Sequence, residues 1–404
     1  MEEWNATKGD YLQIENENAF YSTFLSESRF WIQRVLLPLV VIVGVIGNGV
    51  TVVVLTRRRM RSSTNTYLTA LAISDLLYLI FVFTLSLEHY PDSHTQRFYY
   101  YWVFYRFFLW FTDATTCVST WLTVTFTVER YIAVCHPIKG KIICTESRAR
   151  IAIILVYFLC FLSTVTTPME WQLDFREVSL NRNEMTVYVG QVPTKLGVDT
   201  NYRITFYWFW SVTFVFLPLL LLGVFNSFLI AAVHKSRRDR RRMTQTLRSS
   251  NMQKQENKIT VTLIAVVILF VFCQLPTAIL LILKSVHSPP DNSNTDKLFR
   301  VLGNIFNFLV TVNAASNFLL YCAFSGKYRR TLVATFLSKC VVSPITNSTI
   351  IPETNVSRST LRKNSLEAHT RTLTSFRNTV RNGTLGILST DESSGTCSRK
   401  YFHE

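Results

Sequence analysis

Residues 107–131 read FFLWFTDATTCVSTWLTVTFTVERY, an apolar run that ends abruptly in Glu129-Arg130-Tyr131. At a rise of about 1.5 Å per residue, Phe107–Val128 is long enough to cross roughly 30 Å of hydrocarbon. Backbone polar groups in lipid must be satisfied within the element, which favours a helix over an open sheet. The run therefore predicts a membrane-spanning helix, with the carboxylate of Asp113 inside it.

Six further apolar stretches of similar length surround this one, separated by polar loops. They are Val35–Thr56, Ser62–Leu87, Ile151–Met169, Ile204–Val233, Ile259–Leu283 and Val301–Gly326. Only the second and third of the seven contain an acidic residue, Asp75 and Asp113. The sequence predicts an all-α membrane protein with a seven-transmembrane helix bundle over 31–326, and a transmembrane β-barrel is disfavoured.

Basic residues gather in the links after the first, third, fifth and seventh spans, which lie on one face of the membrane. They include Arg57, Arg58, Arg59, Arg61, Lys139, Lys141, Lys235, Arg237, Arg238, Arg240, Arg241, Arg242, Lys327, Arg329 and Arg330. The positive-inside rule puts this face in the cytosol, with residues 1–30 as an extracellular N-terminus, in a multi-pass protein of the plasma membrane. The formal charge of +16 thus reflects mainly the basic residues placed beside the spans on the cytosolic face, where they can also attract the anionic inner leaflet. It does not indicate nucleic-acid binding.

The two ends of the chain carry modification signals. Asn5 begins a sequon that would face outward, so it is a predicted glycosylation site. Residues 327–340 mix apolar and basic side chains at helical spacing, which predicts an amphipathic membrane-surface helix. Cys340 at its end is either a palmitoylated cysteine or a plain tail cysteine. Residues 341–404 are rich in Ser, Thr, Asn and Arg and are expected to be a disordered cytosolic tail.

Short motifs occur in order, each on a different span. They are Gly47-Asn48, Leu71-Ala72-Ile73-Ser74-Asp75, Glu129-Arg130-Tyr131 continuing to Pro137, Pro218, Pro276, and Asn317-Phe318-Leu319-Leu320-Tyr321. In this order the motifs resemble those of the rhodopsin-like (class A) G-protein-coupled receptors over about residues 31–339, most of all the invertebrate FMRFamide-receptor-like neuropeptide receptors. The resemblance implies a receptor for an extracellular peptide that activates heterotrimeric G proteins, with receptor kinases and arrestin acting on the tail.

The same resemblance implies a signalling switch near the cytosol. Arg130 would pair with Glu129 and with Glu256 at rest and face the G protein after activation. Tyr131, Pro276, Asn317 and Tyr321 complete the implied set. The alternative for Arg130 is an interfacial arginine that only extends its charge toward water.

Asp75 lies near the middle of a span, where an ionised carboxylate must be solvated or paired. By resemblance, a polar cluster around it would hold an allosteric sodium ion, the only cofactor expected. The cluster comprises Asp75, Asn48, Ser119, Asn313 and Asn317. Carboxylate, hydroxyl and amide oxygens suit such an ion, and a hydrated polar network without metal is the alternative.

The chain departs from the family pattern at several positions. Gln274 stands where a tryptophan is usual, Phe318 where a proline is usual, and Asn226 where a tyrosine is frequent. The usual disulfide from the third span to the second outer loop is also missing, since Tyr105 occupies the span position and the loop from Glu170 to Tyr202 has no cysteine. We expect packing or strand pairing to hold this loop, and Met185–Gly190 has a strand-like sequence.

A ligand site is expected at the outer mouth of the bundle. Its acids would be Glu88, Asp113, Glu170 and Asp174, its aromatic walls Trp110, Trp171, Tyr207, Trp208 and Trp210, with Gln274 below them. An acidic, aromatic mouth suits a peptide with Arg or Lys beside aromatic residues. The alternative is an interfacial aromatic belt with solvated acids.

Other functions have less support in the sequence. The last span contains no lysine for a retinal Schiff base, and Thr112 stands where amine receptors have an aspartate. A small amine or a lipid is the rival ligand, and an ion channel or transporter is the rival class, because Asp75 and Asp113 could mark an ion path. The absence of a phosphate loop and of a His-Glu metal motif argues against an enzyme.

Overall fold

The computed structural model describes residues 2–181, 184–243, 249–287 and 289–336. Cys340 and the tail from 341 to 404 lie outside this part. So do the side chains of Asn5 and Glu256, whose backbones are described within helices.

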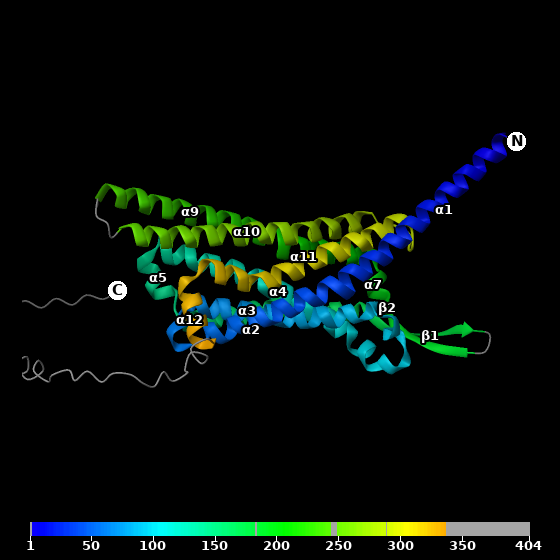
Figure 1. Ribbon diagram of the computed structural model, residues 1–404, viewed down its shortest axis with the longest axis horizontal. Helices are drawn as coiled ribbons and strands as arrows, with labels where there is room; N and C mark the ends of the chain where they lie inside the picture. Colours follow the sequence, from blue (N-terminus) through cyan, green and yellow to red (C-terminus); the bar gives the residue numbers. More distant parts are fainter. Residues whose placement is uncertain (1, 182–183, 244–248, 288, 337–404) are drawn as a thin grey trace, which may run out of the picture. The chain divides into compact units, whose positions relative to one another are not determined.

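Long helices make up most of this part of the chain (Figure 1). The first is α1 (Glu2–Ser28), which continues through a π-helical turn, η1 (Arg29–Leu36), into α2 (Leu37–Leu55). The others are α3 (Ser63–Ser86), α4 (Tyr99–Cys135), α6 (Glu146–Ser163), α8 (Thr200–Ser211), α9 (Leu217–Met243), α10 (Ser249–Val286) and α11 (Asn294–Phe324). Shorter helices are α5 (Pro137–Ile143), α7 (Lys195–Val198) and α12 (Gly326–Phe336).

Side-chain caps and prolines fix where several helices begin and bend. Ser62, Asp199 and Ser293 each accept a hydrogen bond from a backbone N–H in the first turn of α3, α8 and α11. Pro218 follows a π-helical turn, η7 (Val212–Phe216), that joins α8 to α9. A proline lacks the N–H that a regular helix needs, so an irregular turn beside it leaves fewer unmade bonds.

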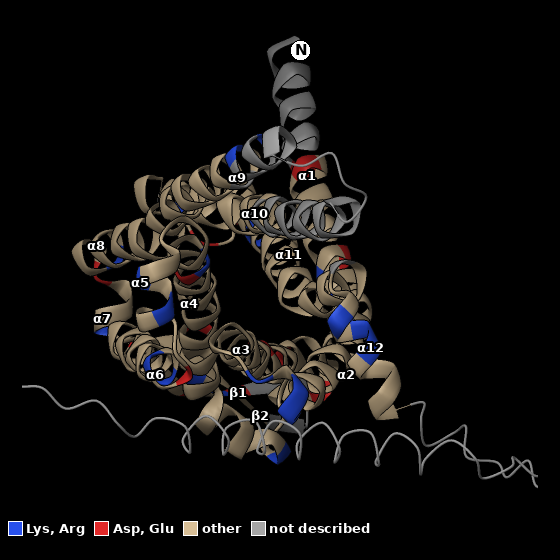
Figure 2. Cartoon of the chain, turned by 90° about the vertical axis from the view of Figure 1, so that its left-hand side faces the viewer, with Lys and Arg blue, Asp and Glu red and all other residues tan. Residues whose placement is uncertain are grey.

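The helices close into a ring, which Figure 2 shows end-on. Each is in contact with the next: α2 with α3, α3 with α4, α4 with α6 and α9, α9 with α10, α10 with α11, and α11 with α2. In the described residues, six helical segments are long and apolar enough to cross a membrane. The seventh, α4, is less apolar because of Asp113 and its many threonines, and ten of its 37 residues are buried. The predicted seven-helix bundle is confirmed.

Two glycines let α2 approach its neighbours closely. A Cβ on Gly44 would lie 2.6 Å from Leu79 Cδ1 and 2.8 Å from Ala315 Cβ, and one on Gly47 would lie 2.9 Å from Phe318 Cβ. Gly49, on the same helix, has nothing within 4 Å of that position. The first two glycines therefore set the distance between α2, α3 and α11, as small residues do in membrane helix packing.

A β-hairpin follows the fourth spanning helix. Strand β1 (Trp171–Asn181) pairs antiparallel with β2 (Glu184–Pro193), with Trp171 opposite Pro193 and Phe175 opposite Val189. This confirms the strand pairing predicted for Met185–Gly190. We call the end of the bundle with this hairpin the hairpin end, and the opposite end, with α5 and α12, the Arg130 end (Figure 1).

Candidate functional site

At the Arg130 end, one carboxylate oxygen connects α4 to α3. Glu129 Oε1 accepts a hydrogen bond from Ser63 Oγ at 2.5 Å and forms an ion pair with Arg130 Nη2 at 3.3 Å. Glu129 Oε2 and Arg130 Nε are buried and have no partner among the described residues. Leaving buried polar atoms without a hydrogen bond costs free energy. The ion pair is therefore only partly satisfied, and Arg130 can exchange Glu129 for another partner.

The other residues of the implied switch have distinct surroundings. Tyr131 packs on α9, with its ring centroid 5.3 Å from that of Phe225. Tyr321 lies 6.0 Å from Tyr328, whose hydroxyl is 3.1 Å from Thr51 Oγ1, so α11, α12 and α2 meet there. Because the side chain of Glu256 lies outside the described part, its pairing with Arg130 stays a prediction.

In the middle of the bundle, Asp75 connects three helices. Ser119 donates to its Oδ1 at 2.8 Å, and Asn317 Nδ2 donates to its Oδ2 at 2.7 Å. Asn313 lines a cavity of about 30 Å³ together with these three residues. That volume exceeds the roughly 10–15 Å³ that one water needs, so the cluster has room for a small hydrated group.

Asn48 bonds elsewhere and lacks the contact with Asp75 that the resemblance implied. Its Nδ2 donates at 3.0 Å to the carbonyl oxygens of Gly44 and Ala314, which links α2 to α11. Its Oδ1 is buried without a partner among the described residues, and it is not part of the cavity wall beside Asp75. The structure thus joins four of the five predicted residues and leaves Asn48 beside them.

A cavity of about 790 Å³ opens at the hairpin end. Of the predicted ligand residues, it is lined by Glu88, Asp113, Glu170, Trp171, Tyr207, Trp210 and Gln274. Gln274 also lines the smaller cavity beside Asp75. It is 3% exposed, and it separates the two cavities together with Tyr78, Thr116 and Val310.

Three predicted ligand residues do not line the cavity: Trp208, which is 44% exposed, Trp110 and Asp174. Trp110 Nε1 donates to Thr164 Oγ1 at 3.1 Å, and its ring packs edge-on against Phe161 of α6. Asp174 accepts from Arg176 Nε at 2.6 Å on the hairpin. Neither Trp110 nor Asp174 lines the cavity, because each side chain is already engaged by a neighbour.

The acids of the cavity have few partners. Thr167 donates to Asp113 Oδ2 at 3.3 Å, and no described side chain forms an ion pair with Asp113. Tyr202 donates to Glu170 Oε1 at 2.7 Å. Burial raises the pKa of the Glu170 carboxyl, and the bond from Tyr202 and the charge of Arg203 offset part of that rise.

The mouth is also more basic than the sequence indicated. Five basic residues line the same cavity: Arg29, His89, Arg203, Lys284 and Arg300. In the sequence, cations at the ends of spans are indistinguishable from interfacial anchors, so the prediction of an acidic mouth was incomplete. The cavity is of mixed charge, with acids and bases contributed by several helices.

Aromatic stacking holds the hairpin to α4. The imidazole of His94 lies between Trp102 and Tyr188, with ring centroids 4.7 Å and 4.4 Å away and nearly parallel planes. His94 Nδ1 is 3.1 Å from the carbonyl oxygen of Val189 and must donate to it, and Gln191 donates to the carbonyl of Trp102. We call these five residues the loop clamp. It lies close to where the family disulfide would be.

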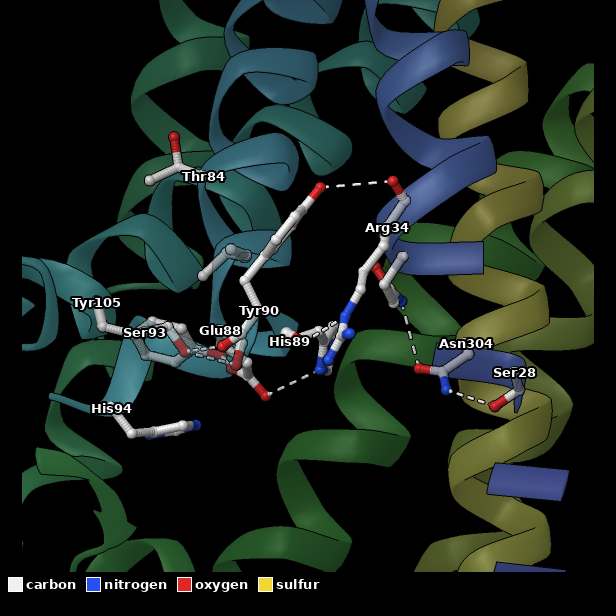
Figure 3. A network of polar contacts seen from close by, with 12 residues as sticks. Ser28, Arg34, Thr84, Glu88, His89, Tyr90, Ser93, His94, Tyr105 and Asn304 are labelled. Carbon is white, nitrogen blue, oxygen red and sulfur yellow. Dashed lines mark hydrogen bonds and ion pairs between the residues drawn. The ribbon is translucent and has the colours of Figure 1, made fainter. Parts of the chain in front are cut away.

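A second polar network at the same end joins α1 and η1 to α11 and to the segment that follows α3 (Figure 3). Arg34 Nε donates to the carbonyl oxygen of His89 at 2.5 Å, and Asn304 Nδ2 donates to Ser28 Oγ at 3.1 Å. Tyr105, at the position of the missing cysteine, donates instead to the Glu88 carboxylate. These contacts fix the helices that form the rim of the cavity.

Known proteins match this chain over most of the bundle. Residues 47–321 match the family described as "7 transmembrane receptor (rhodopsin family)". The FMRFamide receptor of Drosophila melanogaster is 29% identical over 79% of this chain and 56% of its own length. The sex peptide receptor of the same organism is 28% identical over 75% of this chain and 72% of its own length, and the thyrotropin-releasing hormone receptor of Mus musculus is 29% identical over 74% and 77%.

The match to the FMRFamide receptor spans just over half of that protein's length. The family match covers the same spans that carry the ordered motifs and the helix ring, from Gly47 to Tyr321. Members of this family are multi-pass proteins of the plasma membrane and act as receptors rather than enzymes. This chain belongs to the rhodopsin family of seven-transmembrane receptors.

Proposed function

We propose that this chain is a receptor for an extracellular neuropeptide and that it activates heterotrimeric G proteins when the peptide binds. The observation that carries this proposal is the cavity of about 790 Å³ at the hairpin end, which Asp113 lines. Ligand pockets for drug-sized molecules have volumes of roughly 300–1,000 Å³. A cavity near the top of this range, lined by many charged groups, suits several residues of a peptide better than a lipid.

The acids of this cavity supply the polar contacts for a basic peptide side chain. Asp113 has no cationic partner among the described residues, and Trp171, Tyr207 and Trp210 lie in the same wall. A guanidinium between a carboxylate and aromatic faces gains charge-assisted hydrogen bonds and cation–π contacts. The names of the three similar receptors are those of FMRFamide, sex peptide and thyrotropin-releasing hormone, which supports a peptide ligand.

The hairpin end would face the outside and the Arg130 end the cytosol. The excess of Lys and Arg in the links at the Arg130 end supports this orientation. Agonist binding would free Arg130 from Glu129 for a G protein, with Glu256, Tyr131, Pro276, Asn317 and Tyr321 in the roles the family resemblance gives them. A protease-protection assay with epitope tags at the two ends would contradict this orientation if the C-terminal tag were accessible from outside.

The cluster around Asp75 fits a sodium ion as an allosteric ligand. Ser119, Asn313 and Asn317 share its cavity and offer oxygen atoms, and the hydrogen bonds to Asp75 leave lone pairs on both carboxylate oxygens. Sodium there would favour the resting arrangement. If the sodium proposal is right, sodium lowers agonist affinity in the natural receptor and has no effect in an Asp75→Asn variant, with lithium and choline as ion controls.

Receptor kinases and arrestin would act on the Ser- and Thr-rich tail from 341 to 404, where each phosphate adds about −1.5 to −2 charge. Asn5 would carry a glycan and Cys340 a palmitoyl chain that holds α12 to the membrane surface. Arrestin recruitment by a receptor truncated after Cys340, mobility after glycosidase treatment, and palmitate labelling of Cys340→Ala test these assignments separately.

The central test is a second-messenger assay. Cells expressing the receptor are challenged with a library of amidated neuropeptides while calcium and cyclic AMP are measured. Asp113→Asn should reduce the potency of the active peptide by at least about tenfold, because a charge-assisted pair is lost, with surface expression intact. Asp174→Asn is the matched control, since Asp174 pairs with Arg176 outside the cavity. Equal potency of the Asp113→Asn receptor would remove this carboxylate from the site.

A further inference from the structure

One corner of the large cavity carries an excess of positive charge. Arg203 of α8, Lys284 of α10 and Arg300 of α11 all line it. The ammonium group of Lys284 interacts electrostatically with three charged side chains, those of Arg203, Arg300 and Asp296. Apart from Glu170, which lies in the same cavity and interacts with Arg203, these three cations share the corner with one carboxylate.

That carboxylate is already committed to other partners. Asp296 Oδ2 accepts from Arg300 Nε at 2.8 Å and from the backbone N–H of Asn292 at 3.2 Å. Asp291, a further acid in the wall of the cavity, is exposed and is not among the groups that act on Lys284. Asp296 is thus paired with Arg300, and with Glu170 acting on Arg203 the two carboxylates still leave the three cations with one positive charge in excess.

Lys284 itself is partly buried and has no hydrogen bond or ion pair to any described residue. Its Nζ would be 3.9 Å from a Cβ added to Gly303 of α11, so the ammonium group lies against the α11 backbone. Arg203 contacts the face of Tyr207, with 5.9 Å from its guanidinium carbon to the ring centroid. Among the described residues, none accepts a hydrogen bond from the side chain of either cation, so their donors are available to a ligand.

Holding these cations together with one positive charge in excess lowers the stability of the free receptor. A bound anion would remove this repulsion and satisfy the donors. We propose that Lys284 and Arg203 form a carboxylate-binding subsite, so that the ligand carries a carboxylate in addition to the cation received by Asp113. This inference rests on the proposed peptide-receptor function, and it predicts a ligand charged at two separate points.

The carboxylate has two sources in a peptide, an acidic side chain or a free C-terminus. Three probes separate them: Asn-Phe-Met-Arg-Phe-amide, which has neither, Asp-Phe-Met-Arg-Phe-amide, which has an acidic side chain, and Asn-Phe-Met-Arg-Phe as the free acid. On the natural receptor, one acidic probe should be at least tenfold more potent than the neutral probe in the calcium or cyclic AMP response. Equal potency of all three probes would overturn the subsite.

Lys284→Gln should abolish this advantage while leaving the potency of the neutral probe within about twofold. Lys297→Gln is the matched control, because Lys297 bonds Ser22 Oγ at 2.8 Å and does not line the cavity. If Lys284→Gln weakens all three probes equally, the lysine has a structural role and the proposal fails. The ligand-free Lys284→Gln receptor should also melt no lower than the natural one, whereas a lysine needed for packing would lower that temperature.

A second measurement decides the matter even if no probe signals. The three probes are added to purified receptor in detergent, and the shift in melting temperature is recorded for the natural, Lys284→Gln and Lys297→Gln proteins. Stabilisation by an acidic probe that is lost only in Lys284→Gln supports the subsite, even where signalling by these peptides has failed. Equal shifts for acidic and neutral probes, or no shift, overturn it.

Discussion

Glu129 Oε1 is shared between Ser63 and Arg130, while its other oxygen is buried without a partner among the described residues. The arrangement is weaker than a fully satisfied buried pair, since unmade bonds at both partners subtract from it. A restraint of this kind is suited to being released by a modest input from a ligand. The ion pair therefore contributes more to the conformational switching of the receptor than to its stability.

Removing the charge of Glu129 should raise basal signalling. Glu129→Gln keeps the size of the side chain but loses the attraction to Arg130, and a bias of about 1 kcal/mol changes a two-state ratio roughly fivefold. Second-messenger output without agonist, normalised to surface expression, measures the change. Glu146→Gln removes a pair of the same kind, to Arg150 at 3.3 Å, and should leave basal output unchanged; an equal rise in both variants would contradict the restraint.

Glu170 should make agonist potency depend on pH. Its pKa is raised by burial, so the carboxylate takes up a proton at a higher pH than an ordinary glutamate. A cationic peptide group needs the ionised form, so potency is full above the raised pKa and declines as the pH falls through it. Potency measured between pH 7.5 and about pH 5.5 should fall less in Glu170→Gln than in the natural receptor, and parallel curves would exclude Glu170 from the contact.

Single residues were predictable where their chemistry was unusual for their place. Asp75 and Asp113 are acids inside apolar stretches, and both were assigned to sites that the structure also forms around them. Lys284 and Arg203 were missed, because a cation near the end of a span is ordinary. Only the three-dimensional arrangement reveals that several helices direct acids and bases into one cavity.

At the scale of the helix, the closeness of α2 to α3 and α11 depends on Gly44 and Gly47. The spans themselves were predictable from length and polarity. Rotation about the helix axis was not, and for that reason Trp110 was assigned to the cavity although it bonds Thr164 toward α6. Asn48 turned away from Asp75 for a similar reason, because two carbonyl oxygens on α2 and α11 take its donors.

Gly44→Leu should prevent correct assembly of the bundle. Its Cβ alone would approach Leu79 and Ala315 to less than 3 Å, and forcing extra atoms into a packed core costs about 1–3 kcal/mol or more. Surface expression measured by antibody to an N-terminal tag should fall strongly. Gly49→Leu, on the same helix with open space around it, should be expressed normally, and normal expression of both variants would contradict the packing.

For the molecule as a whole, the loop clamp connects the hairpin to α4 and so to the entrance of the cavity. His94→Ala removes two stacked aromatic contacts and the hydrogen bond to Val189. Each aromatic pair contributes roughly 0.5–1.5 kcal/mol beyond area burial. We expect a lower melting temperature of the purified receptor and weaker agonist binding.

Tyr100→Ala is the control for this variant, since Tyr100 is 75% exposed on α4, the helix to which the clamp connects the hairpin. A His94→Ala receptor that matches the Tyr100→Ala receptor in both melting temperature and agonist affinity would show that the hairpin is held by other contacts. Because the clamp and the second network at this end use different residues, a partial loss is the expected result.

The loop clamp consists entirely of ring stacking and hydrogen bonds, and the cysteines that the structure describes are all free thiols. A receptor held together in this way has nothing at its ligand entrance for a reductant to break. Treatment of intact cells with dithiothreitol should therefore leave agonist affinity unchanged, where a receptor braced by a disulfide would lose it. The peptide signal would persist in tissue whose extracellular fluid becomes reducing.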